Sequence, residues 1–254
     1  MEGRYYAVRQ GFGQHRLVSI LPFFLPSSKV PLQYVGGYAV GIPGFTSGTT
    51  SVSLTSLTGG VASAPATGDI IVVGYGVATS SDQTLGFTDN GGTDYTYLCD
   101  LYQSDTYHIN LRTGYKICNG DTNLLVGPTS QDAHPGGVMV HVWRNPNGTP
   151  IDVTTTTATG TNSTRADPPS ITPVTEGAII IACGAGSLNV ITAGYTTSDL
   201  SNFVSVIGDD TNDICVGMGS KVWTSGAFDP AVFGDSTTSA SGSWAAATMA
   251  LRPK

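Results

Sequence analysis

Hydrophobic residues fall in short runs separated by turn-forming residues along most of the chain. Residues 70–73 are apolar throughout, as expected for a strand covered on both faces, and residues 137–143 carry bulky side chains on both faces. No window keeps a 3.6-residue period, which predicts an all-β protein. We expect strands at residues 34–40, 50–57, 69–78, 95–102, 115–118, 137–143, 151–159, 178–184, 203–207, 214–219, 221–224 and 244–251.

The last two thirds of the chain contain two copies of one strand-rich sequence unit. Pro65 is matched by Pro173, 108 positions later, and each proline precedes a glycine and an apolar run. The matched segments are 64–74 with 172–182, 86–88 with 194–196, and 136–144 with 242–252. Two copies are too few for a solenoid. We therefore expect pseudo-repeats at about 57–147 and 166–254 that close one β-sandwich, with residues 145–148 forming a turn.

Residues 1–33 differ from the rest and form a predicted N-terminal arm. They hold four of the eleven basic residues and are rich in aromatic side chains. Those aromatic residues are Tyr5, Tyr6, Phe12, Phe23 and Phe24. The segment is too apolar for a solvated tail, and its prolines and glycines prevent a long helix. We expect an extended arm that binds another surface; the alternative is an arm folded back along its own domain, which would be residues 34–254.

Composition and charge narrow the class of protein. The 254 residues suit one large all-β domain or two small ones, and only 11% of them are charged. The net charge of −7 argues against a nucleic-acid partner, which would need a basic patch. No apolar stretch is long enough for a membrane span. Residues 17–25 superficially resemble a secretory signal, but Pro22 and Pro26 interrupt the region and no small-residue cleavage site follows closely.

Metal and cofactor motifs are missing from the sequence. The four cysteines form no C-x-x-C pair and have no histidine at ligand spacing, which argues against zinc and favours free buried thiols. Residues 74–76 and 184–186 are Gly-x-Gly triplets that do not complete a dinucleotide-binding motif, and we expect them to be turns or bulges. His141 is expected to be a structural residue. The sequence predicts no cofactor.

Two groups of aspartates are candidates for catalysis, and two oxygen-rich segments are candidates for calcium binding. The candidate acid pairs lie in or beside turn-like sequence, where aspartate supports its own backbone. They are Asp100 with Asp105, and the group Asp209, Asp210 and Asp213. Segments 89–94 and 209–213 are rich in oxygen ligands but lack the glycine and closing glutamate of an EF-hand loop. We expect turns at these places and no enzyme activity.

Four tyrosines offer the chemistry of a sugar-binding rim. They are Tyr95, Tyr97, Tyr102 and Tyr107, interspersed with Asp94, Asp100, Asp105 and His108. Strand alternation puts Tyr95 and Tyr97 on one face with Cys99 beside them. The alternative is that these rings fill the edge of the core with their hydroxyls outward. The matching part of the second half has few aromatic residues, so any such site would belong to one half.

Three segments carry a family resemblance. These are residues 136–153, residues 170–177 leading into an apolar strand, and residues 242–253. They resemble the duplicated jelly-roll, lectin-like β-sandwiches found as bacteriophage virion proteins and in some secreted bacterial surface proteins. The similarity covers roughly residues 50–254 and implies a jelly-roll-like fold, with homo-oligomers as a further expectation. The family has no catalytic set to transfer.

The sequence therefore predicts a non-enzymatic bacteriophage structural protein located in the virion. It would be a capsid decoration, head fibre or tail component whose arm docks on capsid or tail subunits or on sister copies. Its outward sandwich could meet a host surface glycan. The alternative is a secreted carbohydrate-binding module of a bacterial surface protein. A glycan-cleaving enzyme is a third interpretation, which would require one of the aspartates above.

Overall fold

The computed structural model describes residues 29–42, 48–105, 108–128, 135–161, 165–187, 193–208, 214–234 and 242–254. This part of the chain is all-β, with every strand pair antiparallel. The strands are β1 (Gln33–Ile42), β2 (Thr50–Ser53), β3 (Ile70–Thr79), β4 (Leu85–Asp89), β5 (Thr96–Gln103), β6 (His108–Ile117), β7 (Asn123–Pro128), β8 (Gly136–Arg144), β9 (Pro146–Ile151), β10 (Thr156–Thr161), β11 (Ile179–Ser187), β12 (Ser201–Ile207), β13 (Ile214–Val222) and β14 (Ser243–Pro253). The arm residues Tyr5, Tyr6, Phe12, Phe23 and Phe24 lie outside the described residues.

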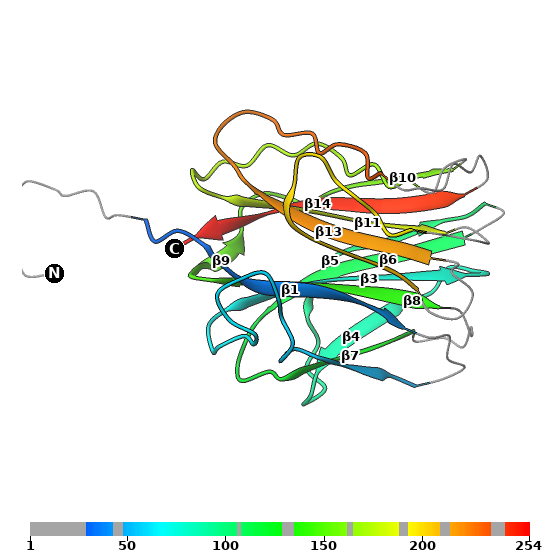
Figure 1. Ribbon diagram of the computed structural model, residues 1–254, viewed down its shortest axis with the longest axis horizontal. Coiled ribbons are helices and arrows are strands. Elements are labelled where there is room, and N and C mark those ends of the chain that lie inside the picture. Colours follow the sequence, from blue (N-terminus) through cyan, green and yellow to red (C-terminus); the bar gives the residue numbers. More distant parts are fainter. Residues whose placement is uncertain are drawn as a thin grey trace, which may run out of the picture.

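The strands form three stacked sheets (Figure 1). The central sheet has the order β1-β8-β3-β6-β5. The upper sheet has the order β10-β14-β11-β13-β12, with β9 also paired to β14, and the lower sheet has the order β2-β7-β4. The central sheet is thus covered on both faces, and the arrangement is a β-sandwich with a third, smaller sheet added to one side.

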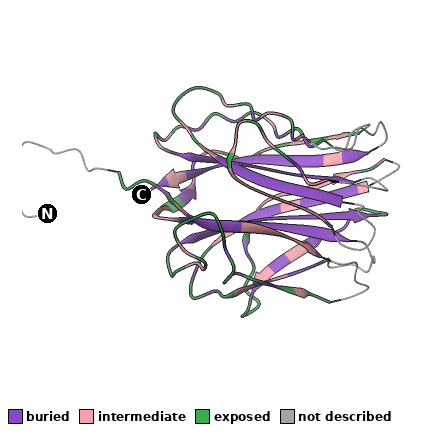
Figure 2. Cartoon of the chain, in the orientation of Figure 1, coloured by how far each residue is buried: buried purple, intermediate pink, exposed green. Residues whose placement is uncertain are grey.

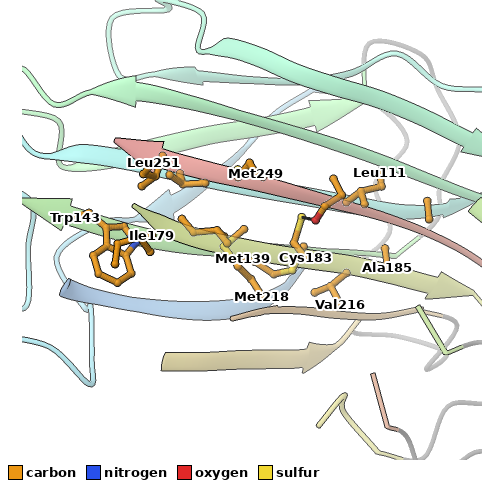
Figure 3. Packing of buried hydrophobic residues seen from close by; sticks show 14 of the residues in the cluster. Leu111, Met139, Trp143, Ile179, Cys183, Ala185, Val216, Met218, Met249 and Leu251 are labelled. Carbon is orange, nitrogen blue, oxygen red and sulfur yellow. Dashed lines mark hydrogen bonds between the residues drawn. The ribbon is translucent and has the colours of Figure 1, made fainter. Parts of the chain in front are cut away.

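Two cores separate the three sheets. The core between the central and upper sheets gathers Met139, Met218 and Cys183, which lie together in Figure 3. The core between the central and lower sheets contains Phe87 and Val126. All ten residues of β3 are buried because it has a core on each side (Figure 2). Such a strand reads as a continuous apolar run, as the sequence indicated.

The upper sheet is also covered on its outer face, but by irregular segments. Every residue of β11 is buried. Ala182, Ala246, Tyr195 and Phe233 form one cluster there, and a second cluster packs Trp223 and other side chains around buried apolar residues of the sheet. Isolated bridges tie these segments together in place of named strands. The outer layer therefore completes the burial of a sheet that would otherwise face water.

The Gly-x-Gly triplets are strand residues, so the expectation of turns or bulges is wrong. Gly74 and Gly76 lie in regular register within β3, and Gly184 and Gly186 lie in β11. The two glycines of β3 allow close sheet packing. A Cβ at Gly76 would lie 2.7 Å from the Cβ of Ala185 in the upper sheet. Glycine at this position lets the two sheets approach each other.

Other strand predictions need correction. Residues 115–118 contain only the end of β6, and β4 and β7 were not expected. The predicted strand at 151–159 is divided between β9 and β10, and the two predicted strands at 214–224 are the single strand β13. Residues 145–148 are not simply a turn. Asn145 has a φ of 64°, but β9 then begins at Pro146 and pairs with the end of β14.

Both chain ends of the described structure meet at one side of the molecule. The amide of Val30 donates a hydrogen bond of 2.9 Å to the carbonyl of Lys254, and Leu32 is buried in the core between the central and upper sheets. At the opposite side, Ile42 pairs with Gly136 and Ser187 pairs with Ser243 (Figure 1). The body therefore begins before residue 33.

Candidate functional site

Tyr95 and Tyr97 pack against Phe87 in the core between the central and lower sheets. Their ring centroids lie 5.4 and 5.0 Å from that of Phe87. Tyr95 is only 3% exposed, and burial raises the pKa of its phenol. Tyr97 is half-buried, with the guanidinium carbon of Arg112 lying 4.0 Å from its ring centroid. Tyr95 is thus too buried to stack on a sugar, and the Tyr97 ring is already contacted by Arg112 and Phe87.

Tyr102 lies at the other end of β5, away from Tyr95. Its ring stacks on His108 at 5.8 Å, and its hydroxyl and the Nδ1 of His108 are 2.6 Å apart. Tyr107 lies outside the described residues. The structure therefore separates the predicted tyrosines into a covered pair and a half-buried ring at the far end of the strand. A glycan-binding role for Tyr102 stays a prediction.

The expectation that Cys99 lies beside Tyr95 and Tyr97 is wrong. The register of β5 against β6 shifts between Tyr97 and Cys99, which marks a β-bulge. Tyr97 packs on the core between the central and lower sheets, whereas Cys99 packs on the core on the other side of the central sheet. An extra residue in a strand reverses the alternation beyond it, and the sequence pattern does not reveal it.

Asp100 and Asp89 are engaged by neighbouring cations or amides. Asp100 forms an ion pair of 2.8 Å with Arg112. Asp89 accepts hydrogen bonds of 2.8 Å from the amides of Gly91 and Thr93, and the Nζ of Lys116 also contacts it. The Lys116 contact and these amides lower the pKa of Asp89 to about 2. Segment 89–94 is thus a turn closed by Asp89, with an ammonium group against the carboxylate. Asp209, Asp210 and Asp213 lie outside the described residues.

Two buried aspartates fix the side of the molecule that carries the chain ends. Arg144 donates to both carboxylate oxygens of Asp69 at 3.0 Å, and Arg252 donates to Asp152 at 3.1 Å. Asp152 also accepts from the amide of Val174 at 2.7 Å. Burial alone would raise the pKa of Asp152, but its hydrogen bonds lower it. These aspartates are structural ions that join strand ends to loops.

A shallow pocket lies beside the first of these ion pairs. It measures about 280 Å³ and is lined by residues 66–69, 144–146 and Lys254. Its lining is mainly polar and lies where the end of β8 meets the end of β14. The Arg144 guanidinium is already bound to Asp69, so it is not available to a ligand. We therefore interpret this pocket as a gap where loops meet.

A second shallow pocket combines aromatic rings with polar side chains, which is the composition expected of a sugar-binding rim at the tyrosines. It measures about 210 Å³ and is lined by Ile180, residues 221–225, Ala227 and Phe228. Trp223 and Phe228 are half-buried, and their apolar support comes from Ile171, Ile180 and Ala250. The indole of Trp223 donates a hydrogen bond of 2.8 Å to the carbonyl of Gly226, which holds the turn.

The second pocket was not predicted from the sequence, although its segment carries one signal. Trp223 and Phe228 flank Thr-Ser-Gly-Ala, a stretch with no large side chain to cover them. Gly226 has a φ of 71°, so the chain turns there and brings the two aromatic residues together. The expectation of few aromatic residues concerned the surroundings of Phe203, and residues 223–228 lie beyond that part of the second half.

Among the residues that the structure describes, no group of three or more His, Cys, Asp or Glu side chains is arranged to hold a metal ion. Within the same residues, no helix is long and apolar enough to cross a membrane. The cysteines are free thiols; Cys118, Cys183 and Cys215 are buried, and Cys99 is half-buried. Comparisons with protein-family models, with curated proteins and with solved structures found no match to this chain.

Proposed function

We propose that the protein is a non-enzymatic structural component of a bacteriophage particle, attached through the side that carries both chain ends. The arm that precedes residue 29 would bind a capsid or tail subunit or sister copies. The opposite side of the sheet stack would face outward. In this role the chain serves as a decoration, head fibre or tail part located in the virion.

The hydrogen bond from Val30 to Lys254 is the observation that carries this proposal. It fixes the root of the arm at one side of a three-sheet stack, beside the end of the last strand. An arm rooted at one side can attach without covering the far side (Figure 1). The exposed side chains of Val30, Val61, Ile117 and Val174 add apolar surface for a partner at this side of the molecule.

The strand order supports a duplicated, jelly-roll-like origin for the fold. Ile70 begins β3 and pairs with Trp143 and Ile117; Ile179 begins β11 and pairs with Leu251 and Val222. The two larger sheets have the same strand order when their strands are matched in turn: β1, β8, β3, β6 and β5 of the central sheet correspond to β10, β14, β11, β13 and β12 of the upper sheet. We infer that the upper sheet is the second copy of the central sheet.

The outer layers extend this correspondence. In the lower sheet, β7 lies between β2 and β4. Above the upper sheet, the amide of Phe233 donates to Ala166, and Thr196 forms a bridge with Gly234. Residues 233–234 therefore lie between the segments at Ala166 and Thr196, just as β7 lies between β2 and β4. Because β1 packs on β12 and β5 packs on β10, a pseudo-twofold relation of the halves accounts for the contacts between the larger sheets.

A truncation tests the attachment. Residues 1–28 should be removed, rather than 1–33, because Leu32 is buried and Gln33 begins β1. The shortened protein should fold with an unchanged unfolding midpoint and should no longer be recovered with purified particles. The full chain is the control, and it should be present in the particles in stoichiometric amounts. Particle recovery equal to that of the full chain would contradict attachment through the arm.

A second candidate function is a secreted carbohydrate-binding module. The pocket at Trp223 and Phe228 favours it, since aromatic rings with a few polar neighbours are typical of small-molecule sites. This function predicts that the protein occurs free in culture medium and binds glycan without particles. Replacement of Trp223 would weaken that binding, whereas deletion of residues 1–28 would not.

A further inference from the structure

The pocket at Trp223 contains a lysine with an unusual environment. Lys221 extends from β13 toward the outer face of the upper sheet, where its Nζ lies 4.2 Å from the ring centroid of Phe228. Within the described part of the chain, the structure records no ion pair for Lys221. Its ammonium group therefore keeps hydrogen-bond donors that Phe228 does not use.

Lys116 is the equivalent lysine of the first half, and its surroundings show how the charge at this position is neutralised there. Lys116 pairs with Ile71 in the central sheet as Lys221 pairs with Ile180 in the upper sheet, one residue after each strand begins. Lys116 is enclosed by the carboxylates of Asp89 and Asp121, the second at 2.9 Å. In the second half, the region around the lysine is instead an open pocket lined by Trp223 and Phe228.

The remaining lining suits a hydroxylated ring. Thr224 and Ser225 are exposed and place hydroxyl groups at the rim. Trp223 offers a half-buried indole whose position is held by its hydrogen bond to Gly226. A sugar presents an apolar face to an aromatic ring and hydroxyls to such a rim, and a carboxylate on that sugar would form a charge-assisted bond with a lysine.

We propose that this pocket binds a carboxylate-bearing saccharide, with the sugar ring against Trp223 and its carboxylate on Lys221. The ligand carboxylate takes the place that Asp89 and Asp121 fill around Lys116. The site belongs to the second half alone, because the first half neutralises its own lysine. The proposal does not rest on attachment to a particle, and it applies to the free chain.

Titration of the full chain with a galacturonic acid tetramer tests the site, with the carboxyl-reduced tetramer as the neutral comparison. The protein has three tryptophans, so the indole NMR signal of Trp223 can be followed beside those of Trp143 and Trp244. We expect a saturable shift of the Trp223 signal. Lys221→Gln should weaken binding of the acidic tetramer by about tenfold, and the reduced tetramer should bind wild type as weakly as the acidic one binds this variant.

Lys254→Gln is the matched control, because it removes the same charge from the polar pocket beside Arg144. It should leave the affinity unchanged. Absence of a saturable Trp223 shift would overturn the proposal. Equal losses in Lys221→Gln and Lys254→Gln would overturn it as well, since they would reflect only the overall charge. Lys221→Gln changes no ion pair recorded in the described structure, so the variant should keep its fold.

Discussion

His141 is a fully buried imidazole between the central and upper sheets. Its Nε2 lies 2.9 Å from the carbonyl of Asn202, and Tyr34 packs edge-on against it at 5.2 Å. Asn202 has a φ of 54°, a conformation that asparagine adopts more readily than most residues. Burial lowers the pKa of His141 from 6.5 to about 4. The imidazole is therefore neutral at physiological pH and donates its proton to Asn202.

This histidine should make the folded state sensitive to acid. Below pH 6.5 the unfolded chain takes up a proton at this position, and the folded protein does not until about pH 4, so stability falls across that window. The full loss corresponds to about 3 kcal/mol. Urea unfolding measured at pH 7 and at pH 4.5 should show most of it.

His141→Gln should remove much of this pH dependence while keeping a donor for Asn202. His108→Gln, which changes the half-buried first residue of β6, is the control and should keep the wild-type slope. An unchanged slope in His141→Gln would mean that other groups produce the acid sensitivity.

At the scale of elements, the packing between β3 and the upper sheet depends on the two glycines of β3. A Cβ at Gly74 would meet the mobile ends of Met139 and Met218, at 2.7 and 3.2 Å. A Cβ at Gly76 would meet the Cβ of Ala185 at 2.7 Å, and that atom cannot move without its strand. The same substitution should therefore have different effects two residues apart.

Gly74→Ala should cost about 1 kcal/mol or less, because methionine adapts to a changed cavity. Gly76→Ala should cost about 2–3 kcal/mol, because it forces the central and upper sheets apart. Chemical denaturation of both variants would measure the difference. Equal costs would indicate that the sheets separate as easily at either position.

Much of this element structure could be predicted from the sequence. The continuous apolar runs located β3 and β11, and the strands expected at residues 137–143 and 244–251 correspond to β8 and β14. The strands β4 and β7 were missed because each is short and carries glycine, and their burial depends on a partner sheet that no local pattern reveals. The bulge in β5 was not predicted for a similar reason, so Cys99 was assigned to the wrong face of the strand. Trp223 was missed because a turn, not a strand, exposes it.

At the scale of the molecule, the two halves depend on each other. Each larger sheet buries one face against the other sheet, so the core between these two sheets needs both halves. Pairing of β9 with β14 adds a link across the halves, and Asp152 binds Arg252 close to the same junction. The third sheet was not predicted, since two pseudo-repeats suggested only two layers.

Division of the chain tests this dependence. Fragments 29–155 and 156–254 should each fail to give a cooperative unfolding transition, because each exposes the apolar face of a five-stranded sheet. Expressed together, they should associate in a 1:1 complex that unfolds as one unit. Sedimentation and thermal unfolding would measure both properties. A fragment that folds stably as a monomer would contradict shared dependence.

The contact between Val30 and Lys254 has a topological consequence. Because these residues are joined by a hydrogen bond of 2.9 Å, a short peptide could connect them and close the described chain into a ring. New ends could then be opened on the opposite side, such as between β12 and β13. A permuted chain of this kind would keep every strand pair yet present its ends on the reverse side. If such a chain were attached to a surface through its new ends, the position of the cut would decide which side of the molecule faces away from that surface.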